Sequence, residues 1–156
     1  MEKIKLDKAD KHILNILQED GRIRNAKLAS ELGMSPSPML ERVKKLEQAG
    51  IIRKYVALIA PEKIGKNTLA FVAVSLAVHQ LGSLDAFKTE IEQLPEVLEC
   101  YHISGPHDFL LKVLVEDMDE YREFVINKLT RIGSLNNIQT WFVLDTVKHE
   151  THITVE

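Results

Sequence analysis

Hydrophobic residues recur every three or four positions through the first 48 residues, which is the period of amphipathic helices. The first such stretch, LDKADKHILNILQEDG, begins with Asp7 as a suitable N-cap and ends at Gly21. A shorter helix is expected to follow a cap at Asn25 and to end at Gly33. A helix of about two turns is not stable alone in water, so it must pack against its neighbours.

The third helix opens with two Ser-Pro pairs, in the stretch GMSPSPMLERVKKLEQAG. Serine is a favoured N-cap, and proline suits the first helical position because its missing N–H would have no partner there. At 3.6 residues per turn, one face of this helix is predicted to pack against the other two helices. This face consists of Met39, Leu40, Val43, Leu46 and Glu47. The opposite face carries Ser37, Pro38, Glu41, Lys45 and Gln48, with Arg42 and Lys44 at the borders. Three helices with a short middle one indicate a helix-turn-helix, whose last helix enters the DNA major groove by its N-terminal end.

After Gly50 the pattern changes to alternating or continuous apolar runs typical of strands. We expect strands at 51–59, 68–79, 97–104, 108–116 and 137–148, and helices at 83–95, capped by Ser83, and 118–133. The last eight residues are a candidate edge strand. The fold class is therefore α+β: a winged-helix-like helix-turn-helix joined by a strand to a ferredoxin-like β-α-β-β-α-β domain. The predicted domains are 1–50, with the helix-turn-helix at about 25–44, a strand and linker at 51–67, and 68–156.

Charge is divided unevenly along the 156 residues. Residues 1–60 hold 12 Lys and Arg against 8 Asp and Glu, whereas residues 61–156 hold 8 against 15. A basic first third indicates a module that binds a polyanion. The sequence has no apolar run of about 18 residues and no apolar signal core at its start, and Cys100 is its single cysteine, so we expect a cytoplasmic protein with no membrane span.

Four stretches resemble one known family: LDKADKHILNILQEDGR, NAKLASELGMSPSPMLERVKKLEQAGII, ISGPHDFLL and NNIQTWFVL. In this order and over nearly the full length, the chain is similar to the Lrp/AsnC (feast/famine) transcription regulators. The most specific elements are SPSPMLERVKKLE at 35–47 and SGPHDFLL at 104–111. The resemblance implies a sequence-specific regulator of double-stranded DNA whose C-terminal domain forms dimers, often octamers. It also implies a small effector, usually an amino acid, and strand 51–59 as the link between domains.

The resemblance makes six residues candidates for DNA contact: Ser35, Ser37, Pro38, Glu41, Arg42 and Lys45. Read alone, the serines and the proline are ordinary capping residues, and most helix charges are solvated. In a recognition helix, free N–H groups bind phosphate, and short side chains let the backbone approach the duplex. Arginine can reach a guanine edge with two hydrogen bonds, whereas lysine acts as a point charge. Glu41 accepts from a cytosine, pairs with Lys45, or deters wrong sequences; Arg22 and Arg24 are weaker phosphate candidates.

Ser104, Gly105 and Asp108 are the effector candidates. On residue chemistry alone they form a turn, because glycine tolerates positive φ and aspartate bonds nearby N–H groups. The resemblance implies an effector held between dimers near this loop. Asp108 would then take the ammonium of an amino acid and the backbone around Gly105 its carboxylate. Pro106 and His107 would shape ligand preference, and Gln139 and Thr140 would add polar contacts.

Two other functions stay open at this point. A sirohaem-decarboxylase-like enzyme would share the two-domain arrangement but has no use for an intact, basic recognition helix. An architectural DNA-compacting protein would lack an effector. The histidine pairs, His102 with His107 and His149 with His152, have no supporting ligand set, so neither a metal nor a cofactor is expected. No paired catalytic groups stand out, so we expect a regulator and not an enzyme.

Overall fold

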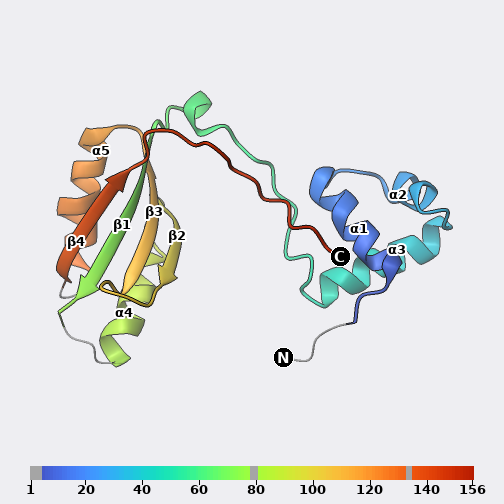
Figure 1. The fold of residues 1–156 in the computed structure, drawn as a ribbon, viewed down its shortest axis with the longest axis horizontal. Coiled ribbons are helices and arrows are strands. Elements are labelled where there is room, and N and C mark those ends of the chain that lie inside the picture. Colours follow the sequence, from blue (N-terminus) through green and yellow to red (C-terminus); the bar gives the residue numbers. More distant parts are fainter. Residues whose placement is uncertain (1–4, 78–80, 133–134) are drawn as a thin grey trace. The chain divides into compact units, whose positions relative to one another are not determined.

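The computed structural model describes residues 5–77, 81–132 and 135–156. Their contacts divide the chain into two units, residues 1–58 with 148–156 and residues 59–147, which we call the helical unit and the sheet unit (Figure 1). The predicted boundary placed the last residues with the second domain, whereas the contacts group 148–156 with the helices. In the described ranges, no helix has the length and apolar character needed to cross a membrane.

The helical unit contains α1 (Lys8–Glu19), α2 (Asn25–Glu31) and α3 (Pro36–Gln48). Asp7 caps α1 as predicted, and it forms a reciprocal capping box with Asp10. Arg24, and not Asn25, is the N-cap of α2, and it makes no side-chain capping bond. The three helices share one core, formed by Ile13, Leu14, Leu28, Ala29, Met39, Val43 and Leu46.

The packed face of α3 is narrower than predicted. Met39, Val43 and Leu46 are buried, whereas Leu40 is 37% exposed and Glu47 is exposed. At 100° per residue, Leu40 and Glu47 lie about a quarter turn from the centre of the buried stripe. They therefore fall at the edge of the contact with α1 and α2.

The predicted strand at 51–59 is wrong for this structure: these residues form neither a helix nor a strand. A strand needs a neighbouring chain segment to pair its backbone N–H and C=O groups. No such ladder partner is present among the described residues, and the side chains of Val56, Leu58 and Ile59 are exposed. The alternating pattern predicted an extended backbone but could not supply its partner.

The sheet unit has the predicted β-α-β-β-α-β order. A short 3₁₀ turn (Pro61–Ile64) precedes β1 (Thr68–Leu76), α4 (Leu81–Ile91), β2 (Val97–His102) and β3 (Phe109–Val115). The helical region from α5 (Met118–Glu123) and the final strand β4 (Leu135–Phe142) complete it. The strands are antiparallel in the order β2-β3-β1-β4, so β2 and β4 are the edges.

Several boundaries differ from the predictions, among them that of the last strand, which was predicted at 137–148 and ends at Phe142. Ser83 lies inside α4 and is not its cap. The predicted helix 118–133 is α-helical only to Glu123 and continues as a π-helical turn (Phe124–Lys128) and a 3₁₀ turn (Leu129–Arg131); its expected end, Gly133, lies outside the described residues. The predicted end of the first strand at 78–79 also lies outside them. The tail adds no edge strand.

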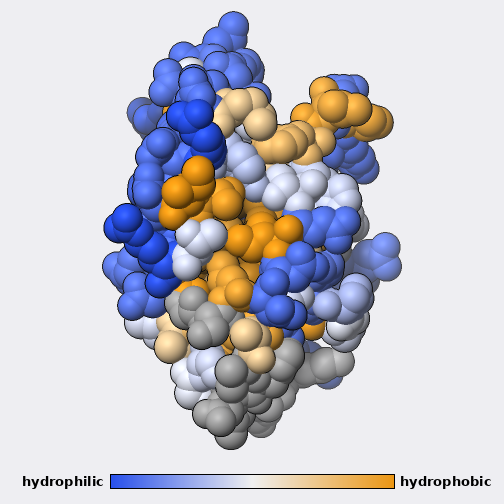
Figure 2. Space-filling model, turned by 90° about the vertical axis from the view of Figure 1, so that its left-hand side faces the viewer, coloured by the Kyte–Doolittle hydropathy of each residue, from blue (hydrophilic) through white to orange (hydrophobic). Residues whose placement is uncertain are grey.

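One face of the sheet packs against the helices of the sheet unit. The other face carries apolar side chains, and no helix of the described part of this unit covers it. The core joins Val72 and Val74 of β1 with Phe87 of α4 and Phe124 near α5. We call the opposite side the open face; strand pairing places on it Leu69, Phe71, Tyr101, Leu110, Leu114 and Trp141. Figure 2 looks onto the side where β4 and α5 lie in Figure 1, and shows hydrophobic side chains gathered at its centre.

Candidate functional site

The start of α3 is exposed and offers few free N–H groups. Ser35 is the N-cap as predicted, but its side chain makes no capping hydrogen bond. Pro36 and Pro38 have no N–H, and Met39 donates its N–H to the Ser35 carbonyl at 3.3 Å. Within this described turn, the Ser37 N–H is left without a backbone acceptor. The helix start therefore presents one backbone donor and two hydroxyl groups, fewer N–H groups than the sequence analysis expected.

The predicted outer face of α3 is exposed in the structure. It consists of Ser37, Pro38, Glu41, Lys45 and Gln48. Glu41 pairs with Lys44 at 3.6 Å and not with Lys45, as one of the predicted alternatives had it. Both side chains of that pair are largely exposed, so the pair is weak. Lys45 forms no ion pair within the described part of the chain, which leaves a cation on the face that would meet DNA.

Arg42 lies at the border of this face and bridges two helices. Its Nη1 donates to Asp7 Oδ2 and to Asp10 Oδ1, each at 2.7 Å. These two carboxylates also form the capping box of α1. The backbone N–H of Asp10 and the Arg42 guanidinium lower the pKa of Asp7, and the carboxylates raise the pKa of Arg42. Arg42 therefore ties the start of α1 to the middle of α3 and acts as a positioning residue.

We expect Arg42→Ala to lower the Tm of the helical unit by up to about 4–8 °C, because it removes both ion pairs that join α3 to the start of α1 in a small domain. Lys44→Ala, an exposed change on the same helix, serves as control. Because the Asp7 pKa lies below its ordinary value of 3.8, the contribution is present above that pH and is lost as the pH falls through the folded value. Calorimetry across pH should show wild type and Arg42→Ala converging in acid. Equal Tm values at pH 7 would contradict the positioning role.

The loop between β2 and β3 is braced against the end of β1. Asp108 donates its N–H to the Val74 carbonyl at 2.9 Å and accepts the Ile103 N–H at 2.9 Å. Its carboxylate Oδ2 accepts the Leu76 N–H at 2.8 Å. Gly105 has φ +130°, which favours glycine, and a Cβ added there would meet open space. The loop thus presents an exposed backbone at Gly105 while the Asp108 carboxylate helps to hold it.

His107 forms a polar bridge beside the loop. Its Nδ1 lies 3.0 Å from Ser75 Oγ, and its Nε2 lies 3.2 Å from Gln139 Oε1. The structure therefore joins Gln139 to the predicted loop and adds Ser75, which sequence reasoning missed. The sequence did offer one sign of this role: Ser75 is a polar residue near the end of the largely apolar strand β1. Thr140 points to the other side of the sheet and hydrogen-bonds Tyr121, so it is not grouped with the loop.

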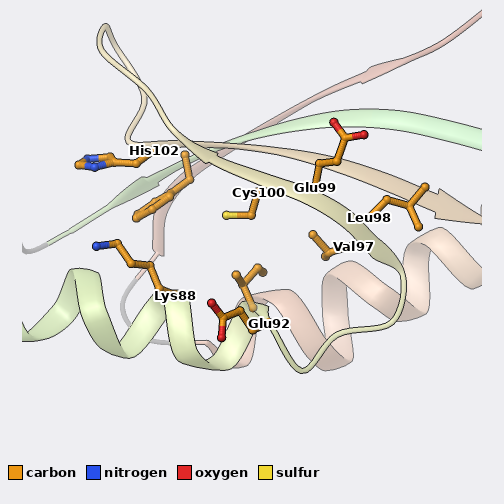
Figure 3. Close-up of a pocket in the computed structure, with 9 residues that line it drawn as sticks. Lys88, Glu92, Val97, Leu98, Glu99, Cys100 and His102 are labelled. Carbon is orange, nitrogen blue, oxygen red and sulfur yellow. The ribbon is translucent and has the colours of Figure 1, made fainter. Parts of the chain in front are cut away.

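A cavity of about 440 Å³ lies between α4 and β2 (Figure 3). Its lining consists of Lys88, Ile91, Glu92, Val97, Leu98, Glu99, Cys100, His102 and Phe109. None of the predicted effector residues lines it, although His102 and Phe109 flank their loop. The Cys100 side chain lies within this cavity in Figure 3, and burial raises the pKa of its thiol. Cys100 is thus a half-buried small side chain with a weakened tendency to ionise.

Two family patterns match the two units. Residues 6–53 match winged helix-turn-helix DNA-binding domains, and residues 69–153 match the Lrp/AsnC ligand binding domain. The leucine-responsive regulatory protein of Escherichia coli is 38% identical over 151 residues, which cover 97% of this chain and 92% of that protein. The chain belongs to the Lrp/AsnC family.

Solved structures of transcriptional regulators share the fold. A transcriptional regulator of Neisseria meningitidis, crystallised with L-Met, has a TM-score of 0.89 at 38% identity, covering 97% of each chain. An AsnC family regulator from Agrobacterium tumefaciens has a TM-score of 0.89 at 34% identity, covering 95% of this chain and 96% of that one. As an Lrp/AsnC protein, the chain is a DNA-binding transcriptional regulator with a ligand-binding domain. Because this family consists of transcriptional regulators and not of enzymes, the sirohaem-decarboxylase-like alternative is ruled out.

Proposed function

We propose that α3 of this regulator enters the DNA major groove by its N-terminal end. The proposal rests on the exposed outer face of α3, where Lys45 has no ion-pair partner among the residues that the structure describes and Ser37 presents its hydroxyl and N–H. Lysine and serine at a helix start suit phosphate contacts, which fix the register of the helix on the duplex. Ser35 and Pro38 complete this surface, Glu41 faces the base edges, and Arg42 holds the helix in place.

We further propose that a free amino acid binds at Ser104, Gly105 and Asp108 and changes DNA binding. An amino acid needs an acceptor for its ammonium and donors for its carboxylate. The loop offers the Asp108 carboxylate and an open backbone at Gly105, with His107 beside it. One relative is leucine-responsive and another was solved with L-Met, which makes apolar amino acids the first ligands to test.

A thermal-shift screen of the free amino acids tests the effector proposal, because a ligand of the native state raises apparent stability by mass action. Mobility shifts on duplexes selected from a random library, with and without the best ligand, then test regulation. We expect a selected pseudo-palindrome and a ligand-dependent change in affinity. DNA binding without a response to any amino acid would favour the architectural alternative, and no DNA binding would refute the first proposal.

The protein is proposed to work in the cytoplasm as a homodimer that assembles further to an octamer. Leu110 and Trp141 belong to an apolar open face, and β4 is an unpaired edge that carries the exposed Trp141 and Phe142. An apolar sheet face and a free edge both need cover. A two-fold dimer also matches a palindromic operator.

Sedimentation equilibrium at micromolar concentration should give a mass that is a multiple of 17.7 kDa. Trp141→Glu, which places a charge on the open face, should shift the distribution toward the monomer. Glu123→Gln, an exposed change on α5, is the control. A wild-type mass of 17.7 kDa would contradict the oligomer.

A further inference from the structure

Two amide side chains of α1 hold the C-terminal tail by its backbone. Asn15 donates Nδ2–H to the Val155 carbonyl at 3.2 Å and accepts the Val155 N–H on Oδ1 at 3.1 Å. Gln18 does the same with Ile153, donating Nε2–H to the carbonyl at 2.9 Å and accepting the N–H on Oε1 at 2.8 Å. Each amide therefore satisfies both polar groups of one tail residue.

The spacing of these contacts is that of a strand laid along a helix. Asn15 and Gln18 are three residues apart, so their side chains are neighbours on α1. Ile153 and Val155 are two residues apart, so in an extended chain their N–H and C=O groups point to the same side. The two amides therefore take the place of a neighbouring strand.

The docked segment is packed as well as hydrogen-bonded. The Val155 side chain packs against the core of the helical unit. The Ile153 side chain is 74% exposed, so α1 binds this residue through its backbone alone. Glu150 Oε1 accepts the N–H groups of Thr151 and His152, each at 3.1 Å, so a side chain also pairs the backbone where the segment begins.

The tail belongs to the helical unit by contact but follows β4 of the sheet unit in sequence. The chain thus passes between the units twice, once near residue 58 and once near residue 148. We propose that residues 152–156 are a strap. Its docking on Asn15 and Gln18 gives the helical unit and the sheet unit a second connection, in addition to the chain near residue 58. With two connections in place of one, the strap restricts how the recognition helices of a dimer can be spaced on DNA.

Tethering favours the docked state, because a segment of the same chain meets its site at a high effective concentration. The contacts are to backbone, with one apolar anchor at Val155, so they can form and break without a unique side-chain fit. The DNA part of the proposal rests on the proposed function. The docking part stands on the contacts of α1 and can be measured without DNA.

Amide hydrogen exchange of the full-length protein tests the docking. In wild type, the Ile153 and Val155 N–H groups should exchange at least about ten times more slowly than in Asn15→Ala/Gln18→Ala, since the variant removes their acceptors. Thr154→Ala, an exposed residue between the two docked ones, is the matched control and should leave both rates unchanged. A chain ending at Thr151 is the second variant, with circular dichroism as the check on folding. Fast exchange of both amides in wild type overturns the strap.

DNA duplexes with two half-sites test its consequence. Moving one half-site by about half a helical turn, roughly 5 base pairs, should weaken wild-type binding strongly because the recognition helices then face different sides of the duplex. In either variant without the strap, the factor by which the moved half-site weakens DNA binding should be about 3- to 10-fold smaller than in wild type. If the Ile153 and Val155 amides exchange slowly in wild type, but moving a half-site weakens DNA binding equally in wild type and in the variants, the mechanical role is overturned. If wild type binds no duplex, the proposed DNA function fails and the mechanical role with it, while the exchange rates still decide the docking.

Discussion

Replacing Asp108 with alanine is expected to weaken binding of an amino-acid effector roughly 30- to 1,000-fold, the range for losing a partly buried charge pair worth about 2–4 kcal/mol. The carboxylate also accepts the Leu76 N–H, so Asp108→Ala removes a brace of the loop as well as a charge. Asp108→Asn separates the two effects. An asparagine keeps an acceptor for the Leu76 N–H but loses the negative charge.

Isothermal titration with the amino acid that the thermal screen selects, starting from L-methionine and L-leucine, measures both variants. If Asp108 pairs with the ligand ammonium, Asp108→Asn should lose nearly as much affinity as Asp108→Ala. Wild-type affinity in Asp108→Asn combined with weak binding in Asp108→Ala would show that the residue only braces the loop. His107→Ala, which breaks the bridge to Ser75 and Gln139, serves as a reference for disturbing the loop without touching a carboxylate.

The coupling between the two sites gives an independent check on the same loop. If the effector changes DNA affinity by a given factor, DNA must change effector affinity by the same factor, because binding free energies around a closed cycle sum to zero. Asp108→Ala should leave DNA affinity unchanged when no effector is present. A large loss of DNA affinity in that state would indicate that Asp108 supports the assembly of the protein.

Local patterns in the sequence were sufficient for most of the fold. The Asp7 cap, the buried Met39, Val43 and Leu46, and the Ser-Pro start of α3 are set by neighbours within a few residues, and the structure has them as predicted. The strand at 51–59 failed because pairing depends on a partner that the pattern of one segment does not contain. The same holds for the tail, whose partners on α1 lie 135 and 140 residues away.

In the functional surfaces, too, features set by nearby residues could be predicted, whereas contacts between distant residues could not. The outer face of α3 follows from helical periodicity, and the structure exposes the side chains of that face. The ion pairs of Arg42 could not be predicted, because its two carboxylate partners lie 35 and 32 residues away at the start of another helix. In the sheet unit, the loop was found through a motif, but the bridge from His107 to Ser75 and Gln139 depends on strand register. Periodicity within a strand predicts its faces and not which residue of the next strand lies opposite.

At the proposed DNA interface, Lys45→Ala should weaken DNA binding roughly 10- to 100-fold. Lys45 is exposed on the outer face of α3 and has no ion-pair partner within the described ranges. A contact between a charged group and phosphate contributes about 1.5 kcal/mol or more, and a dimer would lose it twice. Because the contact is to phosphate, the loss should be similar on selected and unrelated duplexes.

Salt dependence distinguishes this role from base reading. Each phosphate contact releases about one counterion, so Lys45→Ala should reduce the slope of log affinity against log salt by about one per bound helix. Lys44→Ala is the matched control, since Lys44 already pairs with Glu41 at the border of the face. A loss confined to one operator sequence would instead place Lys45 at a base edge. Wild-type affinity and slope in Lys45→Ala would mean that a different face of the helical unit meets DNA.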